Sequence, residues 1–188
     1  MTAATLPRMH GLEVVGAEGA AATGDTAADL AVVELELRHG QALFGFVRRQ
    51  GLTDTEAEDA VQDVLVRLWL EIRAGRAVDN PRAWAYRSVY RIAMDRHRLH
   101  RRVAGLIQRL DARPSAAATR DATDQLAVWA EVDRLPVRQR QVLYLRYRAD
   151  LSFEEIALTL GITASAARSH STQAMATLRR NLAPDEAP

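Results

Sequence analysis

Cysteine is absent from this chain of 188 residues, and so is lysine. Without cysteine the chain has no disulfides, no thiolate zinc sites and no thiol redox sensor. No apolar run approaches the roughly 18 residues of a membrane-spanning helix. Glu13 and Glu18 interrupt the segment in which a signal peptide would have its apolar stretch. These absences argue against secreted and membrane proteins, and they predict a soluble, cytoplasmic protein without membrane insertion.

Arginine supplies all 25 basic residues, and this side chain binds phosphate with a planar, permanently charged group. The formal net charge is only +1, but the charges are unevenly distributed. Residues 81–113 hold nine arginines and two acids, whereas residues 51–79 hold seven acids and three arginines. Opposed blocks of this kind indicate one face for a polyanion and another for a basic partner.

Helical periodicity runs through most of the chain, and no strand-like alternation or hairpin signal accompanies it. Residues 1–28 are rich in Ala, Gly and Thr without an apolar period, so we expect a flexible leader. Residues 111–124 (DARPSAAATRDATD) likewise offer nothing to pack. The sequence therefore predicts an all-α protein with two small helical domains, residues 29–110 and 125–182. A flexible linker at 111–124 would join them, and residues 183–188 would form a tail.

Local signals predict where several helices begin. Thr53 with Glu56, and Ser152 with Glu155, have the spacing of a capping box. Asn80 followed by proline is typical of an N-cap and first helical position. Two helices should therefore begin just after residues 53 and 152, and a third at residue 81.

The segment LSFEEIALTLGITASAARSHSTQAMATLRR (151–180) combines a short capped helix, a glycine turn and a second amphipathic helix. This is the pattern of a helix-turn-helix, in which Gly161 would adopt the positive φ of the turn. An ordinary helical hairpin with a solvated outer face is the alternative interpretation. In the DNA-binding interpretation, the outer face of the second helix carries Ala164, Ser165, Arg168, Ser169 and Thr172.

The segment NPRAWAYRSVYRIAMDRHRLHRR (80–102) mixes arginine with tryptophan and tyrosine. Arginine neutralises backbone phosphate, and aromatic faces stack on unpaired bases, so the combination is typical of a single-strand binding surface. For Trp84 we favour a core position, whereas for the arginines we favour nucleic-acid binding over simple solvation. The sequence thus offers a second candidate DNA surface.

No constellation for catalysis or for a cofactor is found in the sequence. His97 and His100 share a helix face, but the arginines around them would repel a divalent cation. Ser169 and His170 have no nearby acid or oxyanion motif, and no glycine pattern marks a nucleotide loop. We therefore expect that the protein is not an enzyme and binds neither metal nor cofactor.

Three segments, in this order, resemble those of bacterial RNA polymerase sigma factors of the extracytoplasmic-function (ECF) type. DAVQDVLVRLW (59–69) resembles the helix that binds core polymerase. Segment 80–102 resembles the helix that melts and reads the minus-ten promoter element. LPVRQRQVLYLRYRADLSFEEIALTLGIT (135–163) resembles the entry to the helix-turn-helix that reads the minus-thirty-five element. The resemblance covers about residues 30–182.

This resemblance implies an alternative sigma factor that binds core RNA polymerase and directs promoter recognition and DNA melting. Its implied partners are core RNA polymerase, promoter DNA and an anti-sigma factor. The residues that the resemblance assigns are Asp59, Gln62 and Asp63 to core polymerase, Asn80, Trp84, Tyr86, Arg87, Tyr90, Arg91 and Arg98 to minus-ten DNA, and Ala164, Ser165, Arg168, Ser169 and Thr172 to minus-thirty-five DNA.

Some positions depart from the family pattern. Arg91 stands where many relatives carry asparagine. Residues 165–167 (Ser-Ala-Ala) replace the usual Gly-Thr-Val, and His170, Ser171 and Gln173 replace Arg, Leu and Arg. These changes remove basic and apolar groups from the last helix, so we expect weak binding to the minus-thirty-five element.

Two alternatives remain open at this point. Helix-turn-helix regulators of the LuxR type have a similar LSxxEIAxxLG run, although the N-terminal half lacks the strand–helix alternation of their usual companion domains. The second alternative is an interaction protein that keeps the polymerase-binding helix and has lost promoter reading.

Overall fold

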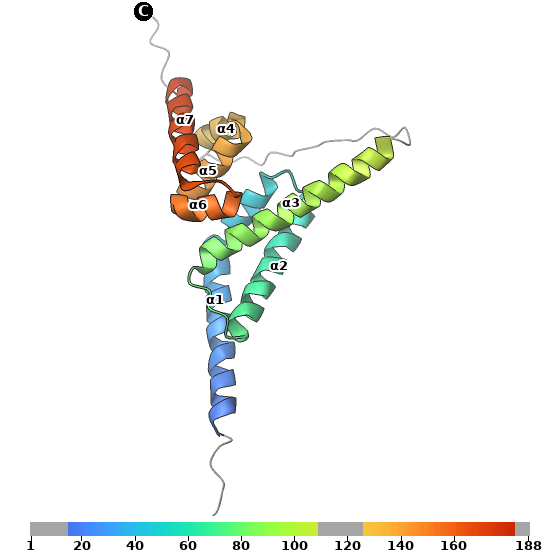
Figure 1. Ribbon diagram of the computed structural model, residues 1–188, viewed down its shortest axis with the longest axis vertical. Coiled ribbons are helices and arrows are strands. Elements are labelled where there is room, and N and C mark those ends of the chain that lie inside the picture. Colours follow the sequence, from blue (N-terminus) through green and yellow to red (C-terminus); the bar gives the residue numbers. More distant parts are fainter. Residues whose placement is uncertain (1–14, 109–125, 183–188) are drawn as a thin grey trace, which may run out of the picture.

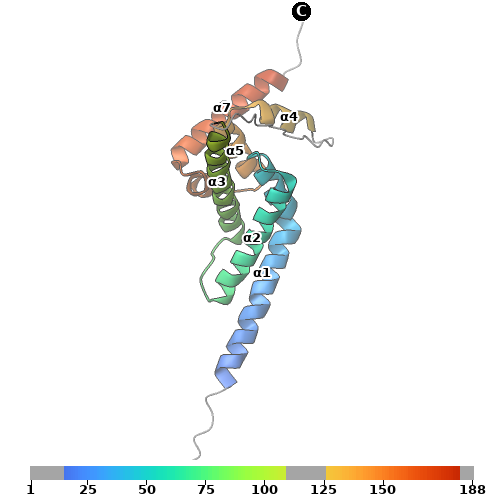
Figure 2. The ribbon, with the colours of Figure 1, turned by 90° about the vertical axis from the view of Figure 1, so that its right-hand side faces the viewer.

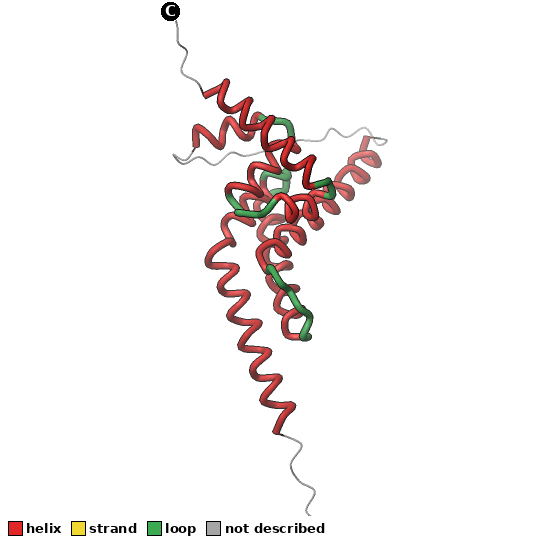
Figure 3. The backbone as a smooth tube through the Cα atoms, turned by 60° about the vertical axis from the view of Figure 1, so that its left-hand side comes forward, coloured by secondary structure: helices red, strands yellow, loops and turns green. Residues whose placement is uncertain are grey.

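The computed structural model describes residues 15–108 and 126–182, which form helices connected by short turns (Figures 1 and 3). No strand occurs in these two ranges, so the predicted all-α class with two helical units is confirmed. No helix in the described ranges is long and apolar enough to cross a bilayer. The N-terminal half comprises α1 (Val15–Arg48), α2 (Asp54–Arg73) and α3 (Pro81–Gln108), and the C-terminal half comprises α4 (Leu126–Arg134), α5 (Val137–Tyr147), α6 (Phe153–Leu160) and α7 (Ala164–Leu182).

Helix α1 begins at Val15, well before the end of the leader that the sequence predicted for residues 1–28. Alanine is frequent in this stretch and has the highest helix propensity of all residues. A helix that is already packed further along also elongates without a new nucleation step. The N-terminal part of α1 consequently projects beyond the other helices (Figure 2). The rest of the expected leader, residues 1–14, lies outside the described residues.

The N-terminal half packs α1, α2 and α3 around an apolar core, with α2 lying alongside α1 (Figure 1). The predicted capping box at the start of α2 is present, with Thr53 and Glu56 exchanging hydrogen bonds. At the start of α3, the Asn80 side chain accepts a hydrogen bond from the Ala83 N–H at 3.0 Å. Both helix starts are therefore confirmed. The largest fully buried side chains in this half are Leu43, Phe46, Val47, Leu52, Val64, Leu68, Tyr86 and Val89.

The C-terminal half contains the predicted helix-turn-helix. Ser152 and Glu155 form the second capping box at the start of α6. Gly161 ends α6 with φ 66° and ψ 41°, a left-handed conformation that L side chains adopt only with strain. The turn after Gly161 leads directly into α7, whose buried side packs on α5 and α6. Glycine is therefore the residue that the backbone of this turn accommodates without strain.

The two halves do not lie apart on a tether: they share one apolar core. Tyr144 of α5 packs against Phe46 of α1, with ring centroids 5.6 Å apart, and α6 lies on the N-terminal part of α3 (Figure 1). The sequence predicted no such packing, because helical periodicity identifies an apolar face but not its partner. The predicted linker, residues 111–124, and the tail, residues 183–188, lie outside the described residues.

Candidate polymerase and promoter surfaces

One exposed face of α2 carries the three residues that the sequence suggested for core polymerase. Asp59 and Asp63 have side chains that are 63% and 56% exposed, and Gln62 between them is also exposed. Val66 and Leu70 continue the same face at helical spacing and are 57% and 48% exposed. The face is thus acidic at one end and apolar at the other.

Sequence reasoning missed Val66 and Leu70 because it considered only charged and polar side chains for the exposed side of α2. The signal was nevertheless present in the spacing. Val66 lies three residues after Asp63, and Leu70 four residues after Val66, so both fall on the exposed side rather than on the buried one. Large apolar side chains beside charged ones are typical of protein–protein contacts.

Two arginines lie close to the acids of this face. Arg96 of α3 is 3.9 Å from the Asp59 carboxylate, and Arg67 is 3.2 Å from that of Asp63. Both carboxylates are more than half exposed, and ion pairs at such exposed groups contribute little and are readily exchanged. The acidic side chains therefore remain available to a basic partner.

Glu56, at the start of α2, is held more firmly. Its carboxylate accepts a hydrogen bond from the backbone N–H of Thr53, which lowers the pKa of Glu56 below its ordinary value; the Thr53 hydroxyl, His100 and Arg96 act in the same direction. The His100 ring lies 3.0 Å from Glu56, whereas the His97 ring contacts the backbone carbonyl of Gln50. The two histidines thus have separate partners, and no group of three metal-ligating side chains gathers within the described ranges.

Helix α3 divides into two parts with different surroundings. Its C-terminal end projects away from the rest of the molecule (Figure 1). The predicted DNA-binding residues Arg91 and Arg98 are exposed on the outer side of the stretch before this end, in which Ala93 is fully buried. Arg98 forms an exposed ion pair with Asp95 at 2.9 Å. This part of α3 therefore presents accessible positive charge, as a phosphate-binding surface requires.

The N-terminal part of α3 is covered by the C-terminal half. Tyr86 is fully buried and Tyr90 is 8% exposed, whereas Trp84 and Arg87 are half-buried. Trp84, for which the sequence favoured a core position, is thus less buried than the two tyrosines. Asn80, also predicted to contact DNA, hydrogen-bonds Glu155 of the C-terminal half. In this conformation the two tyrosines assigned to minus-ten DNA are not exposed to a ligand, whereas Trp84 is partly exposed.

Helix α7 presents the predicted minus-thirty-five residues on its outer side. Ser165, Arg168, Ser169 and Thr172 are exposed, and Ala164 is half-buried. Arg168 lies across the Phe153 ring and forms an ion pair with Glu154 at 2.5 Å. The opposite side of the helix is buried through Ala167, Ser171, Ala174 and Leu178.

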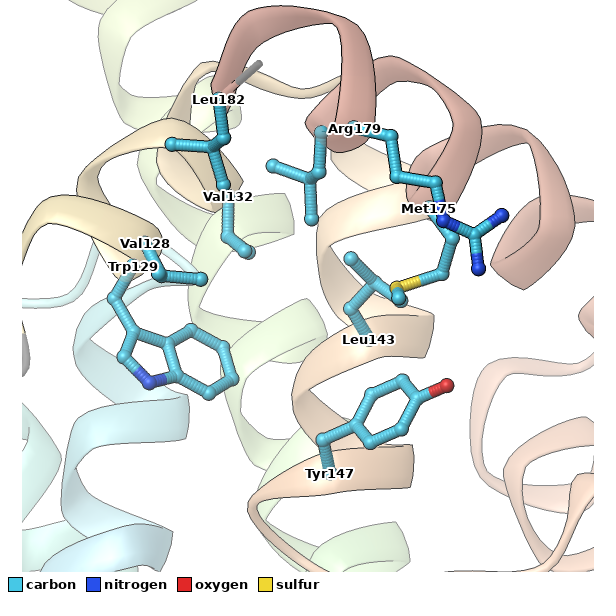
Figure 4. Close-up of a pocket in the computed structure, with 9 residues that line it drawn as sticks. Val128, Trp129, Val132, Leu143, Tyr147, Met175, Arg179 and Leu182 are labelled. Carbon is cyan, nitrogen blue, oxygen red and sulfur yellow. The ribbon is translucent and has the colours of Figure 1, made fainter. Parts of the chain in front are cut away.

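An apolar groove of about 490 Å³ lies between α4, α5 and α7 (Figure 4). Among the described residues that line it, Arg179 alone is charged. Several apolar side chains on its walls, including Val128, Tyr147 and Leu182, are about half exposed. Such a groove is suited to apolar side chains of a protein partner. Sequence reasoning did not find it, because its walls come from three helices. The remaining lining residues are Trp129, Val132, Leu143, Met175 and Leu178.

Each half of the chain matches a known protein family. Residues 37–117 match the family described as Sigma-70 region 2, and residues 132–180 match Sigma-70, region 4. The chain belongs to the sigma-70 family of RNA polymerase sigma factors. Its two matched regions give it the layout of the ECF group. It is thus an alternative sigma factor that binds core RNA polymerase and directs promoter recognition. A helix-turn-helix regulator of the LuxR type would not account for the match to region 2.

Solved structures of sigma factors share this fold. The structure of CnrH in complex with the cytosolic domain of CnrY has a TM-score of 0.53 and 25% sequence identity, and the match covers 88% of this chain and 96% of that one. The sigma factor RpoE from Bartonella quintana, in complex with the anti-sigma factor NepR, has a TM-score of 0.59 and 22% identity. That match covers 81% of this chain and 96% of the other. No curated protein sequence matches this chain significantly.

Proposed function

We propose that the exposed face of α2, with Asp59, Gln62 and Asp63, binds a basic surface of core RNA polymerase, and that Val66 and Leu70 extend this contact. The observation that supports the assignment is the exposure of three polar and two apolar side chains on one side of a well-capped helix. Burial of Val66 and Leu70 against polymerase would provide affinity, while the acids would provide orientation and specificity.

We further propose that α3 and α7 divide promoter recognition between them. The arginines of α3 neutralise phosphate, and its aromatic residues capture bases that are exposed when the minus-ten element melts. The outer face of α7 contacts the minus-thirty-five element. Ser165 and Ser169 are short and uncharged, so each offers at most a modest hydrogen bond to a base edge. The positive charge of α3 should accordingly dominate the total affinity.

Two further features follow from this role as proposals. The protein acts in the cytoplasm, where polymerase and promoter DNA are found, and it is not itself an enzyme. An anti-sigma factor regulates it; CnrH was solved with the cytosolic domain of CnrY, and RpoE with an anti-sigma factor. The apolar groove between α4, α5 and α7 is a surface that apolar side chains of such a partner would bind.

Run-off transcription with core polymerase over a promoter library tests the whole assignment. We expect specific transcripts that depend on the added protein, and gel shifts in which promoter binding requires polymerase. A LuxR-type regulator would instead bind its site alone. Binding to core polymerase without any transcript over the library would favour the alternative in which the chain keeps the polymerase contact and has lost promoter reading.

A further inference from the structure

Two helix segments carry large apolar side chains that lie exposed along one side of the helix. On α1, Leu30, Val33 and Leu37 follow one another at helical spacing, and Leu37 is 81% exposed. On α3, Leu99 and Val103 lie about one turn apart and are also exposed. Large apolar side chains that share an exposed face are typical of a protein–protein contact. We call the first group the α1 stripe and the second group the α3 stripe.

Acidic residues surround the α1 stripe. Residues 15–37 hold five acids and no basic residue. Glu34 lies four residues after Leu30 and three residues before Leu37, so it shares the face of the stripe. Its carboxylate forms an ion pair with Arg38 at 3.3 Å, but both side chains are more than half exposed, and such a pair contributes little. The α1 stripe therefore suits a partner that carries basic residues beside its apolar side chains.

The α3 stripe has the opposite charge. Residues 96–103 hold four arginines and no acid. Arg102 lies three residues after Leu99 on the same face, and it is exposed without an ion-pair partner among the residues that the structure describes. Asp95, one turn before Leu99, is already paired with Arg98 at 2.9 Å. The α3 stripe therefore suits an acidic partner.

Within one chain the two stripes cannot meet. The His97 ring contacts the backbone carbonyl of Gln50, just after the end of α1, and α3 continues from there away from the molecule (Figure 1). Leu37 lies 11 residues before Arg48, the last residue of α1, which corresponds to about 16 Å along a helix. The stripes thus lie on segments that point to opposite ends of the molecule (Figures 1 and 2).

We propose that two copies of this chain associate, with the α1 stripe of each copy packed against the α3 stripe of the other. Each copy contributes one acidic and one basic stripe, so a twofold axis satisfies both contacts at once. Burial of the apolar side chains provides affinity, and Glu34 opposite Arg102 provides orientation. Pairing two α1 stripes would place acid against acid, and pairing two α3 stripes would place arginine against arginine. The charges therefore favour the crossed arrangement.

The association also affects access to α3. Arg98, which is proposed to bind minus-ten DNA, lies directly before Leu99 in the segment that the second copy covers. Single-stranded DNA and a second copy should therefore compete for this part of the helix. This consequence rests on the proposed function of α3, whereas the association itself depends only on the two stripes.

Sedimentation equilibrium over a range of concentrations tests the association. The unsubstituted chain should pass from monomer to dimer as its concentration rises. Glu34→Arg and Arg102→Glu should each weaken the dimer about tenfold, because either change places like charges at both contacts. Glu58→Arg is the matched control: it makes the same reversal at an exposed position on α2 and should leave the dimer unchanged.

Mixing the two weakened variants tests the crossed arrangement specifically. In the mixed dimer, the reversed charge of Glu34→Arg faces the reversed charge of Arg102→Glu at one contact, and the other contact is unsubstituted. The mixture should therefore recover to within roughly threefold of the original affinity, although neither variant does so alone. Both substituted side chains are exposed, so each variant should keep the helical circular dichroism of the unsubstituted chain.

A monomer at every concentration would overturn the proposal, and so would a mixture that associates no better than its two components. If the chain is monomeric and Leu37→Ser weakens binding to core polymerase, the α1 stripe belongs to the polymerase contact instead, and the proposal is equally overturned. Single-stranded minus-ten DNA should convert the dimer to a DNA-bound monomer. A dimer that persists in the presence of this DNA would confirm the association and contradict the proposed function of α3.

Discussion

Charge reversal at Asp63 is the most direct test of the α2 face. Asp63→Arg replaces an exposed acid, at the centre of the face proposed for polymerase, with a base of opposite charge. The substitution removes an attraction to the basic partner surface and adds a repulsion. Core polymerase should therefore bind the variant more weakly, while the folded chain itself should tolerate the change.

The magnitude follows from the exposure of the side chain. Because Asp63 is 56% exposed, its charge interacts in a medium close to water, where two unit charges about 4 Å apart interact by about 1 kcal/mol. Losing one such attraction and gaining one such repulsion amounts to about 2 kcal/mol, or roughly a 30-fold weaker complex. Within the chain, the pair with Arg67 at 3.2 Å becomes a like-charge pair, which destabilises the helix by less than about 1 kcal/mol.

A pull-down with core polymerase, or titration by fluorescence anisotropy, measures the change. Glu36→Arg is the matched control, since it makes the same reversal at an exposed position on α1. We expect the control to bind with the affinity of the unsubstituted chain and the weaker binding of Asp63→Arg to recover partly at low salt. Equal affinities for the two variants would show that this face does not contact polymerase.

Three further predictions address promoter reading and stability. Arg98→Ala should weaken transcription at every promoter and lower the slope of DNA affinity against salt concentration by about one unit. Ser169→Ala should change promoter preference without abolishing melting. Permanganate footprinting compares the two variants, and the reverse pattern would mean that the DNA roles of the two halves are exchanged. Glu56→Gln should lower the free energy of unfolding by about 1 kcal/mol at neutral pH. The folded chain holds the pKa of Glu56 below its ordinary 4.5, so the stability contributed by the ionised carboxylate is lost as pH falls. The difference in unfolding free energy between Glu56→Gln and the unsubstituted chain should therefore shrink below about pH 4.5 in denaturant titrations. A difference that does not depend on pH would contradict this. Gly161→Ala should destabilise the chain by about 1 kcal/mol in thermal unfolding, because φ is 66° and no neighbouring atom is displaced. An unchanged melting temperature would refute that account.

Features that depend on neighbours within one or two helical turns were predictable from the sequence. The capping boxes at Thr53 and Ser152 depend on a side chain and a backbone N–H three residues apart. The turn at Gly161 depends on the conformational freedom of a single residue. Helical periodicity likewise predicted that Ser165 and Ser169 share an exposed side of the last helix. The region order and the sigma-factor function followed from motifs of the same local kind.

The relation between the halves was decided by tertiary structure. Tyr86 and Tyr90 have the sequence signature of a base-stacking surface, yet they are buried beneath helices from the other half. Gly45 looks like a weak point in a helix, and its purpose becomes visible only where Tyr144 approaches it. Val66 and Leu70 lie by their spacing on the outer side of α2, but only the packing shows that no neighbouring helix covers them. The physical reason is that periodicity shows only which face of a helix is apolar. The segment that covers that face is decided by shape and polar complementarity between parts of the chain about 100 residues apart, such as Ala42 and Tyr144.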